Sequence, residues 1–422
     1  MAEKQTKNMK TYSVPYRLDF EHRRCVVGDE PMLFHCHHYN TFLQRSIEDA
    51  DYIDSQPFLV GAAAEVAYAQ MQNLFSAVNV GDEKRRKQLA GELFRWAGFG
   101  SLDLGTIKET GGTVSTPHSH YAVAWKSKFG DSNRPVCHFV EGWLAGTAAA
   151  IYNQPFASYS VEETSCKSKH SDNKCEFSIR QGKPNWSVFN PVGMGQLHDH
   201  KPLPVEKNNV DYDGILNAVS GMELVGDQNG LIPAFGVYLT RMYANYYNRI
   251  SFEFEHALSN KFGKEGIDVA RPLLVEAGHV CAFNTFGGIM TSPEWDALIK
   301  PNLKSKEDWV HGMVAVANSL GWGRWQAPHV SEKETEFVIH DDYESVGYRA
   351  MYGKCDHSVS YLAEGAVIGL MNLVYVGKVH NKPAFTPEFY NDLFKRNTYY
   401  KAEVVSSLAT GDKVTTIKVK KV

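Results

Sequence analysis

Apolar residues follow two different periods along this chain, and each period predicts one kind of element. Residues 141–152 and 364–374 are runs of small and apolar residues, each carrying two glycines four positions apart. Glycines at that spacing share one helical face and let another backbone approach closely, so both segments are expected to be buried core helices. Alternation over residues 336–339, and at Tyr121, Val123 and Trp125, instead predicts half-buried strands.

The same pattern occurs twice. Residues 97–152 align with residues 320–375 at a nearly constant offset. The matched positions are His118/His340, Tyr121/Tyr343, Gly130/Gly353, Glu141/Glu364, Gly142/Gly365 and Gly146/Gly369. Self-similarity of this kind predicts two copies of one structural unit. A weaker match, which pairs Asn40 with Asn284, extends the repeat upstream.

These patterns divide the chain into three parts. We expect a first unit at residues 1–180, a linker rich in Pro, Gly and Asn at residues 181–213, and a second unit at residues 214–422. An aromatic-rich pair of helices, around residues 231–259, introduces the second unit. The predicted fold class is α+β, with each unit an antiparallel sheet packed with helices and the two units arranged as a tandem pseudo-dimer.

Composition narrows the class of protein. The 422 residues are 43% hydrophobic and 22% charged, with a net charge of −4, as in soluble globular proteins. No overall cationic field is available for phosphates, so nucleic acid is not an expected partner. The polar N-terminus lacks the apolar core of a signal peptide, and residues 363–377 are too short and polar to span a bilayer. We expect a cytoplasmic protein that does not bind membranes, with the basic run at residues 411–422 forming a solvated edge strand.

Three cysteines and a glutamate form the strongest chemical pattern. Seven cysteines in a chain without a signal peptide favour metal binding over a disulfide framework. Cys137 precedes the first core helix, Glu163 lies three residues before Cys166, and Cys175 follows. Three thiolates and a carboxylate satisfy a tetrahedral Zn²⁺, and four protein ligands make such a site structural. The alternative is a set of buried free thiols.

Two histidine pairs are a second candidate. If residues 34–40 form a strand, His35 and His37 share one face, and His118 and His120 repeat the spacing. If both pairs met, four imidazole nitrogens could hold Zn, Cu or Fe and form the catalytic site of a metal-dependent enzyme, an oxidoreductase or lyase acting on a small organic substrate. The alternative is that these histidines cap strands or bond within a polar pocket. Whether the protein is an enzyme stays open.

Aromatic residues around the predicted metal loop offer a wall for a flat ligand. Such side chains present ring faces and a few donors, as small-molecule sites do. The candidate ligand-binding residues are His118, Tyr121, Trp125, Phe139, Trp143 and Tyr152. The alternative is that they are ordinary core aromatics.

Residues 134–179 resemble the 4-vinyl reductase domain family. The resemblance is carried by Gly142 and Gly146 after Cys137, and by the acidic and cysteine positions that close with Phe177. In the phenol-sensor branch of that family, three Cys and one Glu hold a structural zinc near an aromatic-ligand pocket. The resemblance implies those roles for Cys137, Glu163, Cys166 and Cys175, although the spacing leaves Glu162 as an alternative to Glu163.

The second copy departs from the family pattern. Ser360 stands in the place of Cys137, and no cysteine pair follows it. We therefore expect the metal in the first half only. The leading hypothesis is a homodimeric small-molecule-binding protein that encloses an apolar or aromatic ligand beside a structural zinc. The metal-dependent enzyme is its alternative.

Overall fold

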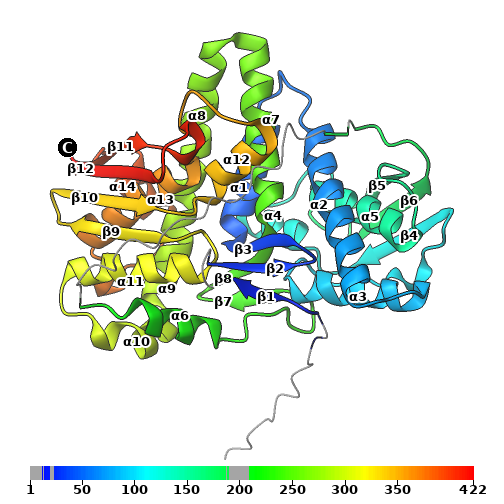
Figure 1. Ribbon diagram of the computed structural model, residues 1–422, viewed down its shortest axis with the longest axis horizontal. Coiled ribbons are helices and arrows are strands. Elements are labelled where there is room, and N and C mark those ends of the chain that lie inside the picture. Colours follow the sequence, from blue (N-terminus) through cyan, green and yellow to red (C-terminus); the bar gives the residue numbers. More distant parts are fainter. Residues whose placement is uncertain (1–11, 13, 20–22, 187, 190–208) are drawn as a thin grey trace, which may run out of the picture.

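The computed structural model describes residues 12, 14–19, 23–186, 188–189 and 209–422. Within these ranges the chain forms helices and three sheets whose strand pairs are all antiparallel. Figure 1 shows a central sheet with one helix-and-sheet group on each side. The mixed α+β class is confirmed. Most of the predicted linker lies outside the described residues.

The central sheet draws strands from both halves of the chain. Its order is β1-β2-β3-β8-β7. Strand β3 pairs with β8 from Met32↔Tyr243 to Cys36↔Leu239, so the two halves are joined by main-chain hydrogen bonds. The strands are β1 (Arg17–Asp19), β2 (Arg24–Val27), β3 (Glu30–Cys36), β7 (Ile232–Ala234) and β8 (Val237–Tyr243).

The first half places its helices around a sheet of order β4-β6-β5. Helix α2 packs along α5, and α5 covers β5. The helices are α1 (His37–Glu48), α2 (Gln56–Ala77), α3 (Glu83–Trp96), η1 (Leu104–Thr106), α4 (His120–Phe129) and α5 (His138–Ile151). The strands are β4 (Gly111–Thr116), β5 (Tyr159–Ser165) and β6 (Cys175–Gln181).

The second half surrounds a sheet of order β11-β12-β10-β9. Its strands are β9 (Trp325–Val330), β10 (Glu334–Ile339), β11 (Tyr400–Ser406) and β12 (Thr415–Lys421). Its longer helices are α6 (Tyr212–Ser220), α7 (Ala244–Phe262), α8 (Lys264–Cys281), α11 (Lys306–Ser319), α12 (Tyr343–Tyr352), α13 (Tyr361–Met371) and α14 (Pro387–Phe394). Short helical segments are η2 (Ala282–Phe286), α9 (Gly287–Thr291), α10 (Pro293–Leu298), η3 (Lys300–Asn302), η4 (Asn372–Val376), η5 (Val379–Asn381) and η6 (Leu408–Thr410).

The two glycine-rich core helices, α5 and α13, are confirmed as buried helices that touch a second backbone. A Cβ on Gly142 would lie 2.0 Å from the Val60 carbonyl oxygen on α2. A Cβ on Gly365 would lie 2.1 Å from the Val275 carbonyl oxygen on α8. Only a residue without a side chain allows helices to approach this closely.

The two halves follow the same path through these elements. A strand (β4 or β10) leads to a short helix (α4 or α12), a core helix (α5 or α13) and two further strands. The registers agree, because Thr116↔Cys175 joins β4 to β6 as Ile339↔Thr415 joins β10 to β12. Each outer pair also shifts register near its end, between Glu163 and Ser165 and between Val404 and Ser406.

Several predicted elements are wrong. Tyr121, Val123 and Trp125 lie on helix α4, since a short apolar run with alanines between the aromatics satisfies either period. The expected helix pair begins instead with the β7–β8 hairpin and continues into α7. The terminal basic run does contain strand β12, but β12 is paired on both sides and is not an edge.

The upstream match of Asn40 with Asn284 is also wrong. Asn40 lies in the first turn of α1, directly after strand β3. Asn284 lies in η2, the continuation of helix α8. In the second half, the junction of β8 and α7 has the same strand-to-helix form, and a Tyr-Asn pair again lies near the helix start, at Tyr247 and Asn248.

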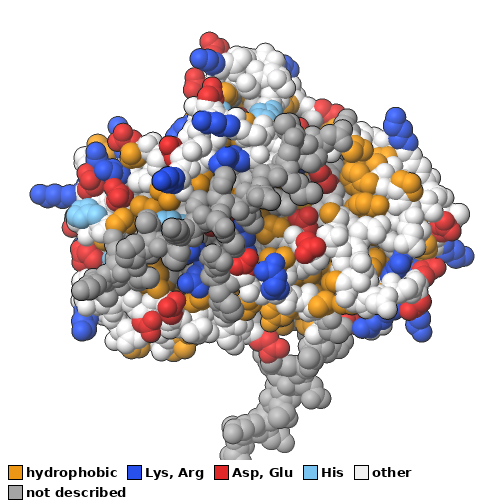
Figure 2. Space-filling model, viewed as in Figure 1, with side chains coloured by type: hydrophobic (Ala, Val, Ile, Leu, Met, Phe, Trp, Pro, Cys, Tyr) orange, Lys and Arg blue, Asp and Glu red, His pale blue; other side chains and the backbone are white. Residues whose placement is uncertain are grey.

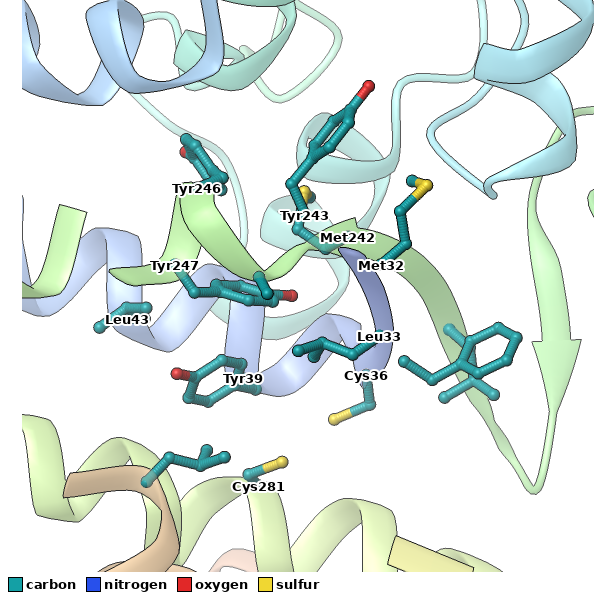
Figure 3. Close-up of a cluster of buried hydrophobic side chains, with 14 of the residues drawn as sticks. Met32, Leu33, Cys36, Tyr39, Leu43, Met242, Tyr243, Tyr246, Tyr247 and Cys281 are labelled. Carbon is teal, nitrogen blue, oxygen red and sulfur yellow. The ribbon is translucent and has the colours of Figure 1, made fainter. Parts of the chain in front are cut away.

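The core between the halves is built at these two junctions. Figure 3 shows tyrosines of α1 and α7 stacked beside residues of β3, with Cys36 and Cys281 facing one another across the boundary. The rings of Tyr39 and Tyr247 lie 5.3 Å apart and meet edge to face. Aromatic pairs of this geometry add to the free energy gained from burial.

One described helix, Lys264–Thr291, is long and apolar enough to cross a membrane by length and composition alone, but 67% of its apolar window is buried in the fold. It packs against α13 and α7 as a core helix. On the face that Figure 2 shows, acidic and basic side chains are interspersed.

Candidate functional site

The first half brings Cys137, Glu163, Cys166 and Cys175 together, and all four side chains are buried. Cys137 is the residue before α5, Glu163 lies on β5, Cys166 follows β5, and Cys175 opens β6. Because β6 pairs with both β4 and β5, the sheet carries the last three residues to the start of α5. One potential ligand atom from each lies within 4.8 Å of the others, so the group can hold a metal ion.

Hydrogen bonds surround the three sulfur atoms. Cys137 Sγ lies 3.7 Å from Cys175 Sγ and 3.1 Å from Ser119 Oγ. Cys166 Sγ lies 3.1 Å from Ser168 Oγ, and the Lys167 backbone N–H donates to Cys175 Sγ over 3.4 Å. Each sulfur therefore has one hydroxyl or amide neighbour, the arrangement that orients thiolate ligands.

Glu163 offers the carboxylate. Its Oε2 accepts a hydrogen bond from the Cys137 backbone N–H at 2.9 Å, while its Oε1 is buried without a partner. Burial raises the pKa of Glu163 to about 9. Its neighbour Glu162 is exposed. Of the two candidates, Glu163 is the one that faces the sulfur cluster.

The charges of the cluster also favour a cation. Burial raises the pKa of the Cys137 thiol, and the neighbouring thiols lower the pKa of Cys166. Several buried acidic groups this close together are costly to ionise unless a positive charge lies among them. A metal ion would supply that charge and take the unpartnered Glu163 oxygen as a ligand.

A second layer of charge, which the sequence reasoning missed, ties this cluster to α1. The Glu163 backbone N–H donates to Glu141 Oε1 at 2.8 Å, and Glu141 Oε2 lies 3.0 Å from His138 Nδ1. His138 Nε2 lies 2.9 Å from Glu48 Oε1. Hydrogen bonds to Glu141 and Glu48 raise the pKa of His138 to about 10 against the effect of burial. A His and a Glu three residues apart at a helix start were the available signal.

The corresponding positions of the second half hold hydroxyls. Ser360 precedes α13, Ser407 follows β11 and Thr415 opens β12, as the three cysteines do in the first half. Asp342 Oδ2 accepts hydrogen bonds from Ser360 Oγ and, at 3.1 Å, from Thr415 Oγ1. Ser345 Oγ lies 2.9 Å from Ser360 Oγ and 3.4 Å from Ser407 Oγ. Hydrogen bonds replace the sulfur cluster there.

A smaller group of potential ligands lies at Cys355, Asp356 and His357. His357 Nδ1 lies 3.3 Å from Cys355 Sγ and 2.7 Å from Asp356 Oδ1, and Nε2 lies 2.9 Å from Glu255 Oε1. Internal partners thus satisfy both ring nitrogens. The sequence reasoning did not single out this group.

The four candidate catalytic histidines do not form one site. Among the described residues, no group of three potential ligand atoms within 4.8 Å includes His35, His37, His118 or His120. The reason is that β3 ends at Cys36 and α1 begins at His37, which breaks the expected alternation. His35 stacks between Tyr39 and Trp322, with ring centroids 4.3 and 4.7 Å away.

The remaining histidines differ in environment. His37 Nδ1 accepts a hydrogen bond from the Tyr238 backbone N–H at 3.1 Å. His118 is partly exposed on the loop before α4. His120 is 2% exposed, and its Nε2 accepts a hydrogen bond from Asn40 Nδ2 at 3.0 Å.

The orientation of the Asn40 amide fixes the tautomer of His120. Asn40 Nδ2 also donates to Thr240 Oγ1, and its Oδ1 accepts from the Tyr247 hydroxyl. Burial lowers the pKa of His120 to about 3, so the ring is neutral. With Nε2 as acceptor, the single ring proton lies on Nδ1, which is buried without a hydrogen-bond partner.

Of the candidate ligand-binding aromatics, the structure brings three together. The Phe139 ring lies 6.0 Å from Tyr121 and 5.1 Å from Tyr246. Trp143 Nε1 donates to the Tyr243 hydroxyl at 3.0 Å. Trp125 instead meets Phe129, and Tyr152 bonds the Ile107 carbonyl at the edge of the half, so these two and His118 lie apart from that cluster.

Comparisons with known proteins place one part of this chain. No curated protein matches the sequence. A solved structure, the phenol-responsive sensory domain of the transcription activator PoxR with phenol, is 15% identical, with a TM-score of 0.34, over 50% of this chain and 89% of that one. Residues 126–181 match the model of the 4-vinyl reductase domain, so the chain contains a domain of this kind that spans all four residues of the cysteine and glutamate cluster.

Proposed function

We propose that this protein senses or carries a small apolar or aromatic molecule, which its first half encloses beside a structural zinc. The 4-vinyl reductase domain match over residues 126–181 supports a small-molecule role. The candidate ligand wall is the cluster of Tyr121, Phe139 and Trp143, which lies on α4 and α5 directly before the metal-binding strands.

The observation that carries the ligand proposal is the unpartnered Nδ1–H of His120. A buried donor without an acceptor costs free energy, and a ligand oxygen would remove that cost. The ring of Tyr121 lies 5.7 Å from the His120 ring. A hydroxylated aromatic molecule satisfies both neighbours, because its oxygen accepts from His120 and its ring packs on Tyr121.

Zinc fits the donor set of the cysteine and glutamate cluster. A Zn–S distance of about 2.3 Å gives a sulfur-to-sulfur edge of roughly 3.8 Å in a tetrahedron. The Cys137 and Cys175 sulfurs lie 3.7 Å apart. With four protein ligands, zinc would serve structurally by fastening the start of α5 to β5 and β6. Its Lewis acidity would not be available to a substrate.

The matching paths of the two halves support a tandem duplication in which the second unit has lost the metal. We further propose that the protein acts in the cytoplasm as a homodimer. The metal-dependent enzyme is not proposed, because the four histidines on which it depended lie in separate environments.

Phenol binding tests the ligand proposal. Isothermal titration calorimetry should show saturable binding by the intact protein, weakened about tenfold in His120→Ala by the loss of one hydrogen bond. His329→Ala, an exposed histidine on β9, is the control. Since the pKa of His120 is about 3, affinity should stay constant from pH 5 to pH 8. Equal affinity in both variants would contradict the assignment.

Cobalt substitution tests the metal proposal. Co²⁺ bound by thiolates gives charge-transfer absorption that oxygen and nitrogen ligands do not produce. The intact protein should show this absorption, Cys175→Ser should weaken it, and Cys355→Ser should leave it unchanged. Absorption that depends on Cys355 would assign the metal to the other half.

A further inference from the structure

A hollow lies where the two halves meet, between the central sheet, α6 and the end of α11. It encloses about 640 Å³ of empty space, part of it open to solvent, which is a common size for a small-ligand site. Its apolar wall includes Met32, Phe34, Leu216, Val219 and Leu224. It contains none of the residues of the metal cluster or of the first-half aromatic cluster.

Arg241 on β8 reaches this hollow with its charge. The guanidinium carbon lies 4.2 Å from the centre of the Phe34 ring and 4.6 Å from the centre of the Trp96 ring. These two cation–π contacts hold the group in place. Its Nη2 donates to the Leu224 carbonyl oxygen at 3.3 Å, and its Nε is buried without a hydrogen-bond partner.

The other charged residues of the hollow are already paired. Arg24 lies 3.0 Å from Asp341, and Arg23 lies 3.5 Å from Asp213. Asp19, which also lines the hollow, lies 3.4 Å from Arg17.

Arg241 itself has no such partner: no carboxylate in the described part of the chain forms an ion pair with it. Its neighbour Cys25 does not neutralise it, because burial raises the pKa of that thiol and keeps it protonated. A cation this far from water favours an anion beside it.

We propose that this hollow binds a small organic carboxylate, whose head pairs with Arg241 and whose apolar body packs against Leu216 and Val219. A guanidinium presents its N–H groups in a plane that matches a carboxylate, which makes this head group the best fit. The hollow is walled by β1–β3 of the first half and by α6, β8 and α11 of the second. A bound carboxylate would therefore contact both halves. This site is separate from the proposed aromatic site.

Octanoate and its uncharged analogue octanamide test the proposal with the full-length protein. Calorimetry should show that octanoate binds at least tenfold more tightly than octanamide, since the two differ only in the charged head. Arg241→Gln should weaken octanoate binding by about ten- to a hundredfold, the range for a charge-assisted hydrogen bond. Arg17→Gln, an exposed arginine on β1, should leave it unchanged.

A second variant covers the case in which Arg241→Gln does not fold. Val219→Trp fills the hollow and keeps Arg241, so it should abolish octanoate binding. Phenol binding in this variant should match that of the intact protein, which separates this site from the proposed aromatic site. The proposal is overturned if octanoate does not bind the intact protein, if octanamide binds equally well, or if Val219→Trp still binds octanoate.

Discussion

The two halves solve the same packing problem with different chemistry. At the start of α5 the first half gathers Cys137, Cys166, Cys175 and Glu163, whereas at the start of α13 the second half gathers Ser360, Ser407, Thr415 and Asp342. Both sets fasten a core helix to the ends of two strands. The hydroxyl set is complete through its own hydrogen bonds, while the sulfur set keeps an unpartnered carboxylate oxygen. The difference teaches that a path of the chain can be kept while the metal-binding chemistry on it is lost.

The largest difference between the halves should appear on removing one side chain at each helix start. Cys137→Ser should lower the free energy of unfolding by about 4–5 kcal/mol, because the loss of a bound metal is among the most costly changes. Ser360→Ala, at the matching position, should cost about 1 kcal/mol through its hydrogen bonds. Chemical denaturation of both variants measures the contrast. Equal costs would mean that no metal stabilises the first half.

The glycines of the core helices should behave alike in both halves. Gly142→Ala and Gly365→Ala each place a Cβ about 2 Å from a carbonyl oxygen of the neighbouring helix. Each should cost roughly 2–3 kcal/mol, as overpacked cores do. Gly81→Ala, where a Cβ meets nothing within 4 Å, is the control. A large cost in only one half would show that the two helix pairs are not equivalent.

The carboxylate of the hydroxyl cluster should matter less. Asp342→Asn weakens the hydrogen bonds that Ser360, Thr415 and the Glu344 backbone N–H donate to it. We expect a loss of about 1–2 kcal/mol, measured by thermal or chemical unfolding. The metal content should not change. Metal loss in this variant would place the ion in the second half.

The smallest contrast concerns pH. Glu48 of the first half pairs with Arg134, which stays charged, whereas Glu255 of the second half pairs with His357. Hydrogen bonds to Cys355, Glu255 and Asp356 raise the pKa of His357 to about 11 from an ordinary value near 6.5. Its stabilising contribution is therefore complete below pH 6.5 and is lost as pH rises toward 11.

His357→Gln should remove this part of the pH dependence. Unfolding free energies measured from pH 6 to pH 10 should fall less steeply in the variant than in the intact protein, by about 1 kcal/mol over the range. An unchanged slope would show that His357 keeps its ordinary pKa.

The sequence predicted those features whose signal is local. Glycine pairs on apolar runs identified α5 and α13, and the spacing of Glu163, Cys166 and Cys175 located residues that β5 and β6 bring together. It could not predict the pairing of β3 with β8, which depends on contacts about 200 positions apart.

The misplaced histidines show the same limit. Alternation at His35 and His37 was real in the sequence, but the strand ends between them because the backbone begins α1 there. His138 and its two glutamates, together with the Arg241 hollow, were missed because their partners are distant in the chain and only the fold brings them together.

Metal stoichiometry, measured by mass spectrometry on the purified intact protein and two variants, tests the central claim most directly. The account predicts one zinc per chain, lost in Cys166→Ser and retained in Ser407→Ala. A protein without metal, or one whose zinc survives Cys166→Ser, would contradict it.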